Sequence, residues 1–127
     1  MNFEKVVFGF FITLAATLNF GFFIGEMDRP ELHSVWGLAA ALAVSVIATI
    51  LKFGDRTQLG AVHLATSLVA DLQLLAAALI WGWAVYATPD GMTGAMMAQV
   101  VSMSGGALLA NLISVVLTLG EILALRR

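Results

Sequence analysis

The stretch from Gly60 to Ala87 is long and apolar, and the one Asp, Glu, Lys or Arg residue in it is Asp71, near the middle. About 20 apolar residues suffice to cross the ~30 Å hydrocarbon core of a bilayer as a helix, so this stretch predicts a transmembrane helix. An aspartate at that depth costs about 2.5 to 3.5 kcal/mol on insertion scales, and such residues normally face protein or water. Asp71 is therefore the main candidate for a functional residue.

Three further apolar segments, bounded by charged residues, occupy most of the remaining chain. The sequence is 61% hydrophobic and 11% charged, whereas soluble domains contain about 25% charged residues. These features predict an all-α, polytopic membrane protein with one transmembrane domain over residues 1–127. The expected helices cover about 3–25, 33–52, 57–87 and 92–125, and the last two exceed the length of a straight crossing. With so little chain outside the helices, we expect no enzyme, no cofactor and no nucleic-acid partner.

The basic residues predict the orientation in the membrane. With the exception of Arg29, they fall at one set of predicted helix ends: Lys5, Lys52, Arg56, Arg126 and Arg127. Positive charge marks the cytoplasmic side, so we expect both termini in the cytoplasm. Amphipathic aromatic rings, which favour the headgroup level, fall at the opposite helix ends: Trp36, Trp81, Trp83 and Tyr86.

Small residues recur every four positions along several predicted helices. Such ridges let two helices approach closely, within one subunit or between copies. The candidates for this packing are Gly21, Gly25, Gly37, Ala41, Gly94, Ala98, Ser102, Gly106 and Ala110. The ridge in the second helix continues into Ser45 and Thr49. We therefore predict a homo-oligomer that assembles through the ridges of the second and fourth helices.

Adjacent glycines in the last predicted helix suggest a break in it. Ser104, Gly105 and Gly106 follow one another, and glycine weakens a helix interior. A full extra crossing would place the C-terminal arginines outside, against the charge rule. We therefore expect a local kink or re-entrant bend at residues 104–106.

Polar residues form a track on the third and fourth predicted helices. A period near four places His63, Ser67 and Asp71 on one stripe of the third helix, with Thr66 beside it. The inner half of the fourth helix contributes Asn111, Ser114, Thr118 and Glu121. At about 1.5 Å per residue, Asp71 and Asn111 lie roughly 17 and 22 Å from the inner helix ends. We expect these two side chains to face each other or the same watery space.

The track contains the three residue types of a hydrolase triad, but in the wrong order. A triad needs the histidine between the other two residues, whereas Ser67 lies between His63 and Asp71. The outer pair is about 12 Å apart along the helix axis, so the two cannot chelate one metal ion within a subunit. We expect neither hydrolysis nor a metal site.

Three stretches carry a resemblance to known sequences: NFGFFIG (Asn19 to Gly25), LKFGDRTQLGA (Leu51 to Ala61) and LATSLVADLQLL (Leu64 to Leu75). They resemble a group of small four-helix bacterial inner-membrane proteins of unknown function. The resemblance covers most of the chain. It implies a multi-pass protein of the bacterial inner membrane and supplies no activity and no site residue.

Two functions fit these features best. The first is passive conduction of monovalent cations by a homo-oligomer in the lipid bilayer, in which one Asp71 per subunit forms a ring of carboxylates. The polar track would line the pathway, and Glu121 would supply a vestibule charge. The alternative is a non-transporting scaffold or accessory subunit, in which Asp71 forms structural hydrogen bonds between helices. A proton-coupled carrier ranks third, because the sequence has no internal repeat.

Overall fold

The computed structural model describes residues 3–125 of the 127-residue chain. It contains the helices α1 (Phe3–Phe23), α2 (Val35–Lys52), α3 (Gln58–Ala87) and α4 (Gly94–Leu125), and a 3-10 helix at Pro30–Leu32. No strand occurs within this part of the chain, so the predicted all-α fold is confirmed. All four α-helices are long and apolar enough to cross a membrane. The molecule is a multi-pass membrane protein that contacts the lipid bilayer.

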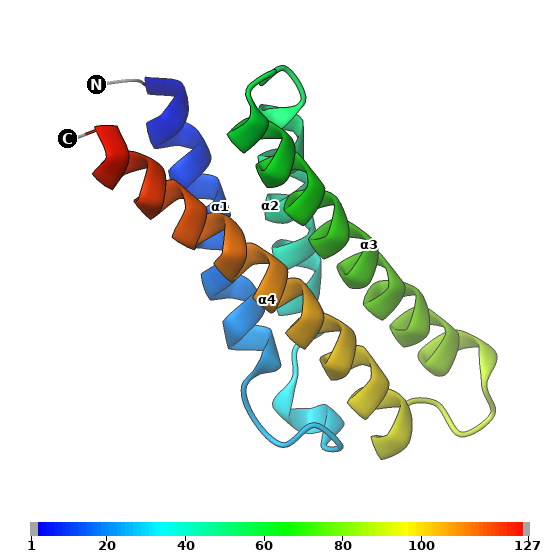
Figure 1. The fold of residues 1–127 in the computed structure, drawn as a ribbon. Coiled ribbons are helices and arrows are strands. Elements are labelled where there is room, and N and C mark those ends of the chain that lie inside the picture. The colour runs from blue at the N-terminus through cyan, green and yellow to red at the C-terminus, as the bar shows by residue number, and fades with distance from the viewer. Residues whose placement is uncertain (1–2, 126–127) are drawn as a thin grey trace.

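The four helices run alternately up and down around a common core (Figure 1). Each helix packs on its neighbour in the chain, and α4 returns to pack against α1. The start of α1, the end of α4 and the α2–α3 loop lie together at one end of the bundle, which we call the terminal end (Figure 1). The α1–α2 and α3–α4 loops lie at the opposite end. Arg126 and Arg127, on which part of the predicted orientation rests, lie outside the described residues.

Side-chain caps fix the beginnings of three helices. Before α2, Ser34 Oγ accepts a hydrogen bond from the backbone N–H of Trp36 at 3.2 Å. Before α3 and α4, Thr57 and Thr93 accept from the amide three residues further on, at 2.9 and 3.1 Å. These hydroxyls satisfy amides that have no carbonyl partner in a first helical turn. The three helices consequently begin one or two residues later than the sequence predicts.

The α1–α2 loop is held by a buried histidine. Helix α1 ends two residues earlier than predicted, and Gly25 follows with a left-handed backbone, φ +109°. In the loop, His33 Nδ1 lies 2.6 Å from the carbonyl oxygen of Phe22, and His33 Nε2 lies 2.9 Å from that of Glu26. His33 therefore joins the end of α1 to the α1–α2 loop.

Helix α4 shows no break at the predicted position, because residues 104–106 are helical with the rest of it. The glycines there serve close packing instead. A Cβ on Gly105 would lie 2.7 Å from Cε1 of Phe23 in α1, and a Cβ on Gly106 would overlap the side chain of Gln73 in α3. The expected break or re-entrant bend is absent, and the missing side chains instead make room for two neighbouring helices.

The small residues predicted to pack helices occupy different environments. Ala41 and Ala110 are buried in the core, and Gly106 meets α3 as described above. Gly37, Gly94 and Ala98 are half-buried, and a Cβ on Gly94 would lie 2.7 Å from the backbone oxygen of Asp28. Gly21, Gly25 and Ser102 are exposed. Contacts between subunits through this exposed set remain a prediction.

Candidate functional site

Asp71 lies near the middle of α3, and its carboxylate reaches across to α2. Ser45 Oγ donates a hydrogen bond to Asp71 Oδ1 at 2.7 Å, and Thr49 Oγ1 lies 2.5 Å from Asp71 Oδ2. The serine and threonine are buried, at 0% and 4% exposure, whereas Asp71 is half-buried. From Gln58, where α3 begins, the rise to Asp71 is about 20 Å. The carboxylate is therefore far from both ends of its helix.

Sequence reasoning did not assign Ser45 and Thr49 to the site. Both belong to the ridge of small residues on α2, one turn apart, and this ridge faces the interior of the bundle. The available signal was the pair of hydroxyls at the end of that ridge. We name Asp71, Ser45 and Thr49 the carboxylate cluster.

Asp71 and Asn111, which we expected to face each other or the same watery space, are not hydrogen-bonded to each other. Asn111 lies on the buried side of α4 at 1% exposure, and neither atom of its amide group has a hydrogen-bond partner among residues 3–125. Next to Asp71 on α3, the residue that faces the core is Ala70, at 0% exposure. Since successive residues of a helix are rotated by about 100°, the next residue points to the side, toward α2.

A second group of polar residues, which we name the interior cluster, lies where α3 packs on α4. His63 Nδ1 is 3.2 Å from Ser114 Oγ, and this same oxygen is 2.6 Å from Thr66 Oγ1. Ser67 is fully buried beside this group, and its hydroxyl has no partner in the described part of the chain. The structure thus brings together much of the predicted track but leaves Asp71 outside it.

The interior cluster is enclosed by α1. The ring of Phe8 packs edge-on against His63, with 4.9 Å between ring centroids. Further along the bundle, Ser104 Oγ of α4 donates to Asn19 Oδ1 of α1 at 2.5 Å. Both of these contacts are buried. Polar groups of three helices therefore meet inside one bundle, away from lipid.

Thr118 and Glu121 take no part in either cluster. Thr118 Oγ1 donates to the carbonyl oxygen of Ser114, within its own helix, at 2.9 Å. Glu121 Oε2 forms an ion pair with Lys5 Nζ at 2.5 Å, which links α4 to α1 at the terminal end. The predicted roles of these two residues in an ion pathway remain predictions.

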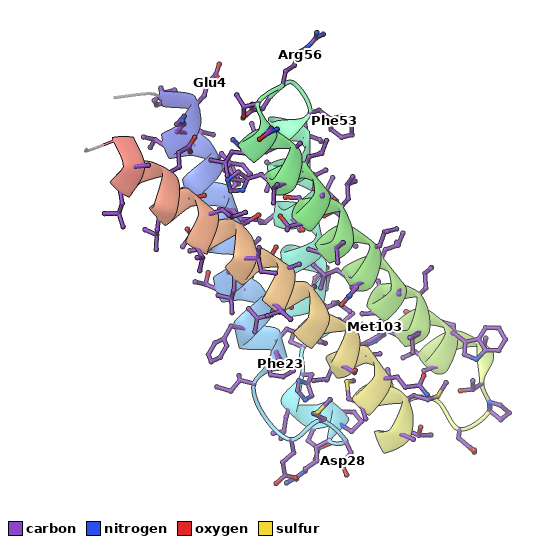
Figure 2. All side chains as sticks on the ribbon, viewed as in Figure 1. Glu4, Phe23, Asp28, Phe53, Arg56 and Met103 are labelled. Carbon is purple, nitrogen blue, oxygen red and sulfur yellow. The ribbon has the colours of Figure 1, made fainter. Side chains whose placement is uncertain are left out.

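The Lys5–Glu121 pair borders a cavity of about 780 Å³ at the terminal end. On its other side Lys52 Nζ lies 3.4 Å from Asp55 Oδ2 and 4.2 Å from the centre of the Phe8 ring. Hydrogen bonds from the hydroxyl and the backbone N–H of Thr57, with a smaller effect of Lys52, lower the pKa of Asp55 to about 2. Arg56 extends away from the bundle at this end, whereas Asp28 lies at the other end of the bundle (Figure 2). Two ion pairs, Lys5–Glu121 and Lys52–Asp55, therefore border the cavity.

The separation of the two clusters limits their chemistry. His63 contacts Ser114, Asp71 contacts α2, and the hydroxyl of Ser67 has no partner among residues 3–125, so no base activates this serine. No group of three or more histidine, aspartate or glutamate side chains in the described residues is placed to hold a metal ion. What the carboxylate cluster offers is a set of hard oxygen atoms at mid-helix.

Comparison with known proteins supplies a family and no activity. No curated protein and no solved structure matches the chain. The matched segment in the family comparison is residues 32–122, which contains α2, α3, most of α4 and the whole carboxylate cluster. The resemblance to uncharacterised proteins is thereby confirmed, and the chain belongs to a family of unknown function (DUF6394).

Proposed function

We propose that this protein conducts monovalent cations across the bacterial inner membrane as a homo-oligomer, with Asp71 of each subunit binding the ion. The observation that carries the proposal is a half-buried carboxylate at mid-helix whose two hydrogen-bond partners are neutral hydroxyls. The ion pairs within residues 3–125 use other acidic residues: Glu26, Glu31, Asp55 and Glu121. With no cationic side chain beside it, the negative charge of Asp71 is left for an ion to balance.

The packing of the bundle supports a pathway between subunits. Several side chains with 0% exposure fill the core near Asp71: Ala70, Leu74, Ala77, Met97, Val100 and Val101. Such packing leaves little room for an ion inside one bundle. Asp71 is instead partly exposed at the α2–α3 surface, next to Leu72, which is 67% exposed. Copies arranged with this surface toward a common axis would form the predicted ring of carboxylates.

The proposal includes the orientation of the bundle in the membrane. Lys5, Lys52 and Arg56 all lie at the terminal end, whereas Arg29 lies in the loop at the opposite end. By the charge rule the terminal end, with its cavity, faces the cytoplasm.

The test measures flux of H⁺, Na⁺ and K⁺ separately, in liposomes that hold the purified protein. We expect flux of at least one cation from the natural protein, a loss of ten-fold or more in Asp71→Asn, and no loss in Asp90→Asn. The control removes an exposed carboxylate of the α3–α4 loop. No flux of any of the three ions from folded protein, or equal flux from Asp71→Asn, contradicts the proposal.

A second test addresses the assembly. The chain has no cysteine, so a single introduced cysteine reports on its own position. Leu72→Cys on α3 should form disulfide-linked dimers in membranes, because copies meet at the α2–α3 surface. Leu109→Cys on α4, where leucine is 62% exposed, should stay monomeric under the same oxidant, because the interface proposed here is the α2–α3 surface and not the α4 ridge that the spacing of small residues predicts. The reverse pattern would place the interface on another face and remove Asp71 from it.

One observation favours the alternative of a non-transporting scaffold. Both oxygens of the Asp71 carboxylate are already in contact with hydroxyls of α2, so the residue also joins two helices. As a scaffold, the protein would show no flux at all, and Asp71→Asn would weaken its association with itself or a partner protein. The flux and cross-linking tests together separate the two functions.

A further inference from the structure

We propose that the ion bound at the carboxylate cluster is a proton, so that Asp71 is a neutral carboxylic acid when the site is loaded. This inference rests on the proposed function, because it names the ion for that same site. It makes the protein a proton conductor, in which each Asp71 takes up and releases one proton. The argument uses the contacts within the cluster, its charge environment and its exposure to lipid.

The contacts within the cluster favour one additional hydrogen. Three oxygen pairs are in hydrogen-bond range: Ser45 Oγ with Asp71 Oδ1 (2.7 Å), Thr49 Oγ1 with Asp71 Oδ2 (2.5 Å), and Thr49 Oγ1 with the carbonyl oxygen of Ser45 (3.0 Å). The two hydroxyls supply two hydrogens, and an ionised carboxylate and a carbonyl supply none. One of the three pairs therefore lacks a hydrogen when Asp71 is ionised.

A proton on Oδ2 of Asp71 completes the set. Ser45 then donates to Oδ1, the Oδ2–H group donates to Thr49, and Thr49 donates to the carbonyl oxygen of Ser45. This last bond is the one that threonine commonly forms to the carbonyl four residues earlier in a helix. The loaded state thus has one hydrogen bond more than the ionised state, with no side chain moved.

The charge environment gives an ionised Asp71 no support. The acidic and basic residues on the helices that pack against α3 lie at the terminal end and are engaged there: Lys52 with Asp55, and Glu121 with Lys5. On α3 itself, His63 contacts Ser114 on α4. The half-buried carboxylate therefore has no ion-pair partner among residues 3–125, and a proton is a counter-charge that the cluster can hold without another side chain.

The position at the surface explains how the proton would exchange. The residues that flank Asp71 on the outer side of α3 are aliphatic and exposed: Leu68, Val69, Leu72 and Leu75. Against lipid these side chains keep water away and favour the neutral acid. At a contact with a second subunit, polar groups or water beside Asp71 would let the proton leave. Loading and release would therefore occur in different surroundings of the same residue.

Carbodiimide labelling tests the protonation state without depending on transport. The O–H group of a protonated carboxyl adds across one C=N bond of dicyclohexylcarbodiimide: its oxygen bonds to the central carbon, and its proton goes to nitrogen. The resulting O-acylisourea rearranges to a stable N-acylurea, which adds the mass of one reagent molecule to the peptide. We expect labelling of Asp71 at neutral pH, a decline as the pH rises, no label at this position in Asp71→Asn, and unchanged labelling in Asp90→Asn.

A second measurement covers the case in which the reagent does not reach the site. Infrared difference spectra of the natural protein and Asp71→Asn should show the carbonyl stretch of a protonated carboxyl, and this band should disappear at high pH. Absence of the band at every pH at which the protein is folded overturns the inference, as does labelling that Na⁺ or K⁺ suppresses at constant pH.

The two proposals fail in different ways. A protonated Asp71 in a protein that conducts no ion would overturn the proposed function and leave a neutral structural acid. If Na⁺ or K⁺ flux depends on Asp71 and the carboxyl band is absent, the proposed cation conduction stands and the inference that the bound ion is a proton is overturned. Proton flux that Asp71→Asn lowers ten-fold or more, together with the band, supports both.

Discussion

Replacement of Asp71 by asparagine should leave the stability of the protein nearly unchanged, whereas replacement by alanine should lower it. An asparagine reproduces the hydrogen-bond pattern of the protonated acid. Its oxygen accepts from Ser45, its NH₂ group donates to Thr49, and Thr49 keeps its bond to the carbonyl oxygen of Ser45. Alanine removes both hydrogen bonds between α2 and α3 at this level and leaves a buried hydroxyl without its partner.

The magnitude follows from the two hydrogen bonds that alanine removes. Hydrogen bonds between transmembrane helices are worth about 0.6 kcal/mol each on average, and up to about 1.7. Without both of them, Asp71→Ala should have a free energy of unfolding about 1 to 2 kcal/mol below that of the natural protein. Asp71→Asn should stay within about 0.5 kcal/mol of the natural protein, because every oxygen pair keeps a hydrogen.

Equilibrium unfolding in mixed micelles, followed by circular dichroism, measures both differences. A double-mutant cycle with Ser45→Ala isolates the Ser45–Asp71 hydrogen bond itself, and we expect a coupling energy of about 0.5 to 1 kcal/mol with Asp71→Ala. If asparagine destabilises as much as alanine, the cluster requires the negative charge, and the hydrogen-bond argument is refuted. If the two alanine substitutions are additive, the hydrogen bond between these residues does not exist.

Three further predictions concern packing and charge elsewhere, each measured by thermal unfolding in detergent. Gly94→Ala should destabilise the protein by about 1 to 3 kcal/mol, because the new Cβ meets the backbone oxygen of Asp28, which cannot move cheaply. Gly120→Ala places its Cβ in open space and should stabilise the protein by about 0.5 to 1 kcal/mol, so equal shifts in the two variants would contradict this contrast. Since folding lowers the pKa of Asp55 from 3.8 to about 2, the natural protein should exceed Asp55→Asn in stability above pH 4, and the difference should vanish as the pH falls toward 2; a difference that persists there would exclude this cause. Asn111→Leu should stabilise by about 1 kcal/mol, because both amide atoms lack partners among residues 3–125; a loss of stability would mean that the amide has an unrecognised partner.

The helices could be predicted from the sequence because the property that defines them is local. A segment that must satisfy its backbone in lipid becomes a helix wherever its apolar run is long enough. The bounds were within two residues, and the differences come from caps such as Ser34 and Thr57, which are also local. Neither inference requires knowing which helices are neighbours.

The partner of Asp71 could not be predicted, because a period of four is only close to the true period of a helix. A helix has 3.6 residues per turn, so a residue eight positions on is rotated by about 80° from the first. His63 therefore contacts Ser114 of α4 and Ser67 is buried, whereas Asp71 has turned toward α2. The stripe drawn through these three residues joined two different surfaces.

The same rotation explains why the small residues of α4 lie in different environments. A step of four residues turns about 40° around the helix, so an unbroken series winds across several faces. Ser102 is exposed, Gly106 meets Gln73, and Ala110 is buried. The spacing alone cannot say which member contacts a helix of the same subunit. The adjacent glycines were misjudged for a related reason, since their contacts come from α1 and α3, and no pattern within α4 reveals a neighbour.

The division of polar residues between two faces of α3 decides where an ion could pass. The interior cluster is enclosed on the terminal side by Phe8 and is buried, which suits the joining of helices more than the passage of a charge. The carboxylate cluster has one buried side, made by α2, and one partly exposed side that only lipid or another molecule can cover. An ion that reaches Asp71 must approach from that second side. The proposed conduction therefore depends on what covers the α2–α3 surface, and we expect a single bundle alone in lipid to hold the proposed proton without releasing it.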